Sequence, residues 1–195
     1  LFTGINCARL AGRHYGPFPH SKTRPAIAEA NIFAQVTQRL PAHPAPAAFA
    51  NAYPEIFFEK AKARNRWTVT TLACRNAGIR LRRLADLQRD EALTAALPRV
   101  AWRDRLDLPV TPVSANDAGR HLYDLTDTHP FVLFEYYLTD KAGHSQSMDK
   151  AARVLTDLDA FLAGLLGALD PATSLLVLTS DHGNIEALSV KSHTR

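Results

Sequence analysis

Two mostly apolar runs flank a long amphipathic segment in the last third of the chain. The runs, residues 131–137 and 174–179, are short and rich in leucine, β-branched and aromatic side chains, which is typical of strands buried on both faces. Between them, residues 148–169 carry leucine and alanine on one side at helical spacing. Strand, long helix and strand in this order predict one right-handed βαβ unit of a parallel sheet. We therefore expect the α/β fold class.

Similar spacing predicts shorter elements in the rest of the chain. The predicted helices cover residues 4–10, 25–40, 68–78, 93–106 and 117–125, and residues 47–53 are a predicted strand. The helix at 117–125 is expected to be capped near Ser114 or Asn116. The segment from about 54 to 116 is a candidate for a helical insertion or cap within one domain, residues 1–195.

Size and chain ends set the broad class. A chain of 195 residues with 46% hydrophobic content suits one packed domain. No apolar run reaches the roughly 18 residues that a membrane span needs. The chain opens without methionine and stops directly after a dense polar motif, so we interpret it as a truncated domain. We expect a cytoplasmic protein, although the missing N-terminus leaves a signal peptide open, and the oligomeric state is not predicted.

Metal-competent residues follow both predicted strands. Asp140 and His144 come after the first, and Asp181 and His182 come after the second. Ligands of open parallel sheets bind outside the carboxyl ends of the strands, so both groups are expected in one crevice. Mixed carboxylate and imidazole ligands favour Zn or Mn, whereas Mg prefers oxygen ligands alone.

The spacing of these residues indicates two ions. Asp140 and His144, four positions apart, can face one ion from a loop or a first helical turn. Asp181 and His182 are adjacent on a predicted strand end, where consecutive side chains diverge, so they would reach toward two ions. His193 could return across a loop to complete one site. Taken singly, each motif is more often a capped turn or a surface histidine, but together they favour a metal site.

These motifs resemble a known family. The stretches 178–186 (LTSDHGNIE) and 191–195 (KSHTR) resemble the metal-binding signature of the alkaline phosphatase superfamily. Asp140-Lys141-Ala142-Gly143-His144 is similar to the Asp-x-x-Gly-His element of the metalloenzyme domain shared by cofactor-independent phosphoglycerate mutase and phosphopentomutase. Residues 1–6 resemble the stretch just downstream of that family's nucleophile. The resemblance implies a three-layer α/β/α fold with a mainly parallel sheet.

The resemblance also implies roles for individual residues. Asp140, His144 and His193 would bind one divalent ion, and Asp181 and His182 would bind the second. No catalytic residue is assigned in this chain, because the Ser or Thr nucleophile is expected upstream of Leu1. The implied function is a metal-dependent phosphatase or phosphomutase that acts on a small phosphorylated substrate through a phospho-enzyme, with two Zn or Mn ions, or Mg. Sulfatases and phosphodiesterases use the same scaffold and stay as alternatives.

Charge distribution raises a different alternative. Residues 59–105 hold twelve Lys or Arg against five Asp or Glu, within a net charge of +4 for the chain. A non-catalytic domain could use this basic segment to bind nucleic acid. Its aromatic side chains are few, Trp67 and Trp102, and they form no stacking pattern for single strands. We therefore expect no nucleic-acid partner.

Overall fold

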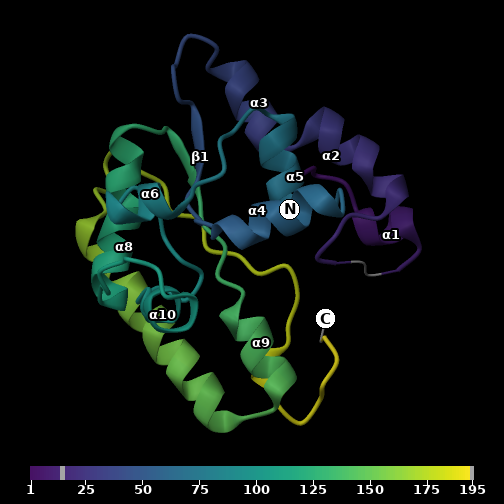
Figure 1. The fold of residues 1–195 in the computed structure, drawn as a ribbon. Coiled ribbons are helices and arrows are strands. Elements are labelled where there is room, and N and C mark those ends of the chain that lie inside the picture. The colour runs from purple at the N-terminus through teal and green to yellow at the C-terminus, as the bar shows by residue number, and fades with distance from the viewer. Residues whose placement is uncertain (14–15, 194–195) are drawn as a thin grey trace.

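Helices surround a small parallel sheet in the computed structural model, which describes residues 1–13 and 16–193 (Figure 1). The described strands are β1 (Ala47–Phe49) and β2 (Phe131–Leu133). The first half of the chain contains α1 (Cys7–Ala11), η1 (Ser21–Thr23), α2 (Arg24–Ala30), α3 (Ile32–Arg39), α4 (Glu55–Ala63), α5 (Val69–Asn76) and α6 (Leu84–Gln88). The second half contains α7 (Val100–Leu106), α8 (Ala115–Asp124), η2 (Leu125–Asp127), α9 (Leu138–Ser145), α10 (Met148–Ala168) and η3 (Ile185–Ala187).

Local sequence signals explain the helices that were predicted well. The hydroxyl of Ser114 accepts a hydrogen bond of 3.0 Å from the N–H of Asp117, so α8 begins at the expected cap. Helix α10 runs from Met148 to Ala168, which confirms the predicted 148–169 element. Among the described residues, none of the helices combines the length and apolarity that a bilayer crossing requires.

Other predicted helices are shorter or divided. The 25–40 element is split into α2 and α3 at Asn31, whose backbone is extended and whose side chain accepts from the N–H of Ala34 at 3.0 Å. The 93–106 element is helical only from Val100, because Leu97 and Arg99 have φ values of 52° and 63° that no α-helix accepts. The 4–10 element is replaced by α1, which starts at Cys7.

Strands β1 and β2 pair in parallel, with Ala47 opposite Phe131 and Phe49 opposite Leu133. Both lie inside predicted strands, although each is shorter than expected. Beyond their ends, the buried amide of Asn51 continues the ladder: its Nδ2 donates to the carbonyl oxygen of Glu135 at 2.8 Å, and the Glu135 N–H donates to its Oδ1 at 2.9 Å. The carboxyl ends of the two strands are thereby held together, next to the start of α9.

The second strand of the predicted βαβ unit is not formed. Residues 174–179 have no regular structure, and Leu175, Val177 and Leu178 are 87%, 70% and 70% exposed. No strand in the described part of the chain pairs with them, so their backbone groups lack the ladder that defines a strand. Leu176 packs inward, against the core between α8 and α10. The α/β class is confirmed with a small parallel sheet, whereas a three-layer arrangement is not established by the described residues.

Two well-packed regions support the sheet. The first joins β1 to helices α2–α5 through buried aromatic side chains, including Phe33, Phe49, Phe58 and Trp67. In the second, α8 crosses α10 at very short range. A Cβ atom placed on Gly164 would lie 1.9 Å from the backbone oxygen of Asn116, so only glycine allows this approach.

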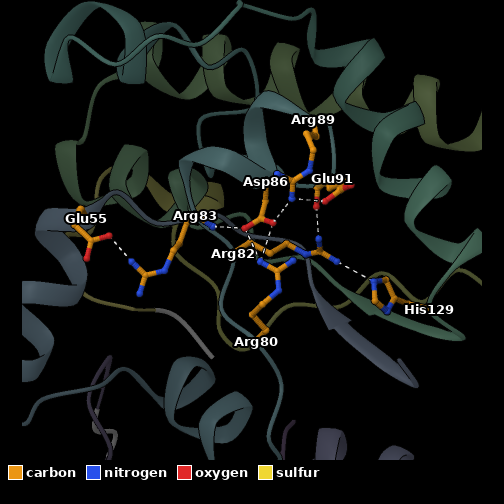
Figure 2. Close-up of polar contacts among 8 residues, drawn as sticks. All are labelled: Glu55, Arg80, Arg82, Arg83, Asp86, Arg89, Glu91 and His129. Atoms are coloured by element: carbon orange, nitrogen blue, oxygen red, sulfur yellow. Dashed lines mark hydrogen bonds and ion pairs between the residues drawn. The ribbon is translucent and has the colours of Figure 1, made fainter. Parts of the chain in front are cut away.

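A network of arginines pins residues 80–91 to the sheet (Figure 2). The buried carboxylate of Asp86 accepts from Arg80 at 2.7 Å and from Arg89 at 3.0 Å. Burial alone would raise the pKa of Asp86, but the hydrogen bonds from Arg80 and the backbone outweigh it and hold the pKa below its ordinary value. Nη2 of the buried Arg82 lies 3.0 Å from Nε2 of His129, two residues before the start of β2. The 54–116 segment is therefore attached to the sheet, while its origin as an insertion stays a prediction.

Candidate metal centre

Helix α9 presents Asp140 and His144 on one face, directly after the end of the sheet. Residues four apart lie one above the other on a helix, and Oδ1 of Asp140 is 3.3 Å from Nε2 of His144. The sequence predicted a loop or a first helical turn for this motif, and the structure places it in a helix of eight residues. Both side chains are held by a regular element rather than by a free loop.

His193 returns from the C-terminal segment to the same point. Its Nε2 lies 3.2 Å from Oδ1 of Asp140 and 3.1 Å from Nε2 of His144. The three donor atoms form a nearly equilateral triangle. Two ligand atoms about 2.0–2.1 Å from one tetrahedral ion lie about 3.3 Å apart, so the triangle has the dimensions of a shared metal ion. The structure thus brings together the three residues that the resemblance assigns to the first ion.

The orientation of His144 suits a metal ligand. Its Nδ1 lies 2.9 Å from the carbonyl oxygen of Lys191, and a carbonyl oxygen only accepts hydrogen bonds. In the neutral ring Nδ1 therefore carries the proton, and the lone pair of Nε2 is directed at Asp140 and His193. Metal-bound histidines in proteins are usually held by a hydrogen bond of this kind.

His182 and Asp181 lie at the edge of the triangle. Nε2 of His182 is 4.0 Å from Oδ1 of Asp140, and its ring stacks on His193 with centroids 3.8 Å apart. Oδ1 of Asp181 is 3.7 Å from Nε2 of His182, although the side chain is 70% exposed. The expectation that these two side chains diverge from a strand end is wrong, because residues 181–182 form a bend. Their assignment to a second ion stays a prediction.

Asn184 and Gly143 are the site residues whose roles sequence reasoning missed. The buried Asn184 donates from Nδ2 to Oδ1 of Asp140 at 2.7 Å and to the Asp140 carbonyl oxygen at 3.2 Å. A Cβ atom on Gly143 would lie 2.3 Å from Oδ1 of Asn184, so only glycine admits the amide against α9. Both residues belong to the motifs that carry the ligands, and their position there was the available signal.

A family model covers the segment that carries these residues. Residues 111–195 match the family model described as Metalloenzyme superfamily. This match confirms the resemblance that the motifs indicated. It covers every residue of the Asp140, His144 and His193 triangle, together with Asn184 and Gly143. Binding of a divalent metal is therefore supported at family level, without the number or identity of the ions.

Comparison with curated proteins points the same way. The chain is 26% identical over 96 residues to a 2,3-bisphosphoglycerate-independent phosphoglycerate mutase of Ehrlichia ruminantium, covering 44% of this chain and 19% of that protein. It is 30% identical over 60 residues to the mutase of the same name from Ehrlichia canis, covering 31% of this chain and 12% of that protein. The chain thus spans less than a fifth of the length of these relatives. No solved structure matches it significantly.

Electrostatic repulsion links Asp181 to a carboxyl group at the end of the sheet. Glu135, at the end of the sheet, accepts a hydrogen bond from the hydroxyl of Thr70. Burial raises the pKa of Glu135, the Thr70 hydrogen bond lowers it, and the negative charge of Asp181 raises it again. The carboxylate of Asp181 therefore disfavours the ionised form of Glu135. A cation bound near Asp181 would relieve their repulsion, which fits a metal at this end of the sheet.

Proposed function

We propose that this chain is the metal-binding part of a phosphatase or phosphomutase that uses two divalent ions and a Ser or Thr phospho-enzyme. The observation that carries the proposal is the triangle of Asp140, His144 and His193, with donor atoms 3.1–3.3 Å apart. The matched family and the mutase relatives support metal-dependent phosphoryl chemistry as its class. The nucleophile is proposed to lie outside residues 1–195.

Each residue has a definite part in this proposal. Asp140, His144 and His193 would hold one ion, and Asp181 with His182 would contribute to the second. Zn or Mn suits these mixed donors, with Mg as the alternative. Two such ions activate a hydroxyl nucleophile and stabilise charge on a transferring phosphoryl group. Asn184 orients the carboxylate of Asp140, and the Lys191 carbonyl orients His144.

A small phosphorylated substrate is favoured over nucleic acid. The basic segment 59–105 has much of its charge engaged within the protein. Carboxylates pair with Arg80, Arg83, Arg89, Arg99 and Arg103. Such arginines are less available for the phosphate backbone of a nucleic acid. Sulfate esters and phosphodiesters stay as alternative substrates, because the scaffold alone does not choose among them.

Metal binding by the chain tests the centre directly. Equilibrium dialysis against Zn or Mn, followed by elemental analysis, should show bound metal that a chelator removes. Asp140→Asn and His144→Gln should each weaken binding by more than about 100-fold, since they remove ligands. His43→Gln, a histidine outside the triangle, should leave it unchanged. Metal affinity that is equal in all four proteins would refute the assigned centre.

Turnover tests the reaction class. A polypeptide that contains this chain and the nucleophile should hydrolyse or transfer a phosphomonoester, and Asp181→Ala or a chelator should abolish the activity. A phosphodiester, a sulfate ester and DNA serve as competing substrates and ligands. Preference for either ester would select the corresponding alternative enzyme class. Tight, salt-sensitive DNA binding without turnover would contradict the enzyme proposal and favour a nucleic-acid-binding domain.

A further inference from the structure

A second basic feature lies on the opposite side of the metal-bearing helix. Helix α9 turns about 100° per residue, so Leu138, Lys141 and Ser145 lie on one face while Asp140 and His144 lie on the other. The first face forms one wall of a surface pocket of about 380 Å³. Its lining includes Arg105, Leu138, Lys141, Lys150, Arg153 and Val154.

Four basic residues from three helices line this pocket. Arg105 comes from the end of α7, Lys141 from α9, and Lys150 and Arg153 from the first turns of α10. No carboxylate lines the pocket, and no ion pair engages any of the four side chains within the described residues. Like charges gathered in this way repel one another, so the arrangement favours a bound anion.

The arginine network of Figure 2 shows what a structural basic cluster looks like in the same protein. There, Arg80 and Arg89 share the buried carboxylate of Asp86, and Arg83 pairs with Glu55. Those charges are balanced within the fold. The pocket on α9 has no such internal counter-charge among the described residues, so its counter-charge has to come from outside.

We propose that this pocket binds a small molecule with two or more phosphate groups. Four cations match a multiply charged anion, since phosphate groups accept charge-assisted hydrogen bonds from several Lys and Arg side chains at once. The apolar residues Leu138 and Val154 also line the pocket, so the ligand can carry a carbon skeleton. A pocket of about 380 Å³ has the size of a small-molecule site rather than of a duplex groove. The ligand site is separate from the metal centre and does not depend on the proposed enzymatic function.

Inorganic pyrophosphate is the probe for this site. Isothermal titration of the chain at low ionic strength, with a chelator present to keep the metal centre empty, should show one binding site. Lys150→Gln and Arg153→Gln should each weaken binding by about tenfold, the loss expected for one charge-assisted contact. Lys62→Gln removes the same charge from α4, away from the pocket, and should leave the affinity unchanged. His144→Gln, at the metal centre, should also leave it unchanged.

Chemical protection provides a measurement that does not depend on variants. Pyrophosphate should protect Lys141 and Lys150 from acylation in the wild-type chain, but not Lys62, as read by mass spectrometry. The proposal would be overturned if pyrophosphate does not bind. It would also be overturned if Lys62→Gln loses as much pyrophosphate affinity as Lys150→Gln and Arg153→Gln. Weaker pyrophosphate binding by His144→Gln would contradict the proposal, because it would show that the anion binds at the metal centre. Duplex DNA that binds more tightly than pyrophosphate and protects the same lysines would make this surface a nucleic-acid interface instead.

Discussion

Two apolar runs of similar composition adopt different structures in this protein. Residues 131–133 become β2, pair with β1 and contact the aromatic core through Phe131 and Leu133. Residues 174–179 carry leucine and valine as well, yet they stay irregular, with Leu175 87% exposed. Local strand preference does not explain this difference. Residues 131–133 have a neighbouring strand, β1, to hydrogen-bond with, and residues 174–179 pair with no strand among the described residues. An apolar run therefore predicts a strand only where the tertiary structure supplies a neighbour.

The largest expected effect is a difference in how much a substitution in each region lowers the free energy of unfolding. Phe49→Ala removes a fully buried ring from β1 and should lower the free energy of unfolding by about 3–5 kcal/mol. Leu178→Ala removes an exposed side chain and should change it by less than about 0.5 kcal/mol. Urea unfolding followed by circular dichroism measures both. Equal losses would mean that residues 174–179 are packed after all.

Two glycines of α10 test how tightly α8 and α10 pack against each other. Gly164→Ala places a Cβ atom 1.9 Å from the Asn116 backbone oxygen and should cost about 1–3 kcal/mol. Gly167→Ala, one turn further along, meets no atom within 4 Å and should be neutral or stabilise by up to about 1 kcal/mol. Thermal unfolding of the two variants gives the comparison. A neutral Gly164→Ala would show that α8 and α10 can separate at little cost.

Asn184 tests whether the irregular C-terminal segment is nevertheless ordered where it meets α9. Asn184→Ala removes the hydrogen bond of 2.7 Å to Asp140 and should weaken metal binding by about 10–100-fold. Asn76→Ala, at the exposed end of α5, is the matched control and should bind metal normally. Competition with a metal-sensitive dye reports the affinity. An unchanged affinity in Asn184→Ala would limit this residue to a packing role.

The smallest expected effect concerns Glu135, where the sheet meets the C-terminal segment. Its pKa is raised in the folded state, so between the ordinary value of 4.5 and the raised value the folded chain binds more protons than the unfolded chain. The free energy of unfolding should therefore fall as pH rises through this window and level off above it. Glu135→Gln, which cannot ionise, should remove this contribution and gain stability over wild type as pH rises.

Urea unfolding of metal-free protein from about pH 4 to about pH 7 checks this sign. Glu59→Gln, an exposed carboxylate on α4, is the control and should show no such trend. A difference between Glu135→Gln and wild type that shrinks as pH rises would contradict the assignment of a raised pKa.

The sequence by itself determined the elements whose signals are local. Helical spacing located α8 and α10, and Ser114 marked the start of α8. The four-residue spacing of Asp140 and His144 predicted that both can face one ion from a loop or a first helical turn, and the structure places both on one face of α9. The position of His193 across a loop made it a candidate third donor, and the resemblance then assigned it to the ion of Asp140 and His144.

Only the tertiary structure decided features that depend on distant partners. Strand formation at 131–133 required β1, more than 80 positions earlier, and the lack of such a neighbour left residues 174–179 irregular. The contact of Asn184 with Asp140 joins residues 44 apart and needs the absence of a Cβ atom at Gly143. The basic pocket likewise assembles side chains from α7, α9 and α10. Such contacts depend on how the helices and strands pack against one another. The spacing of apolar residues along the chain does not predict which distant elements will be in contact.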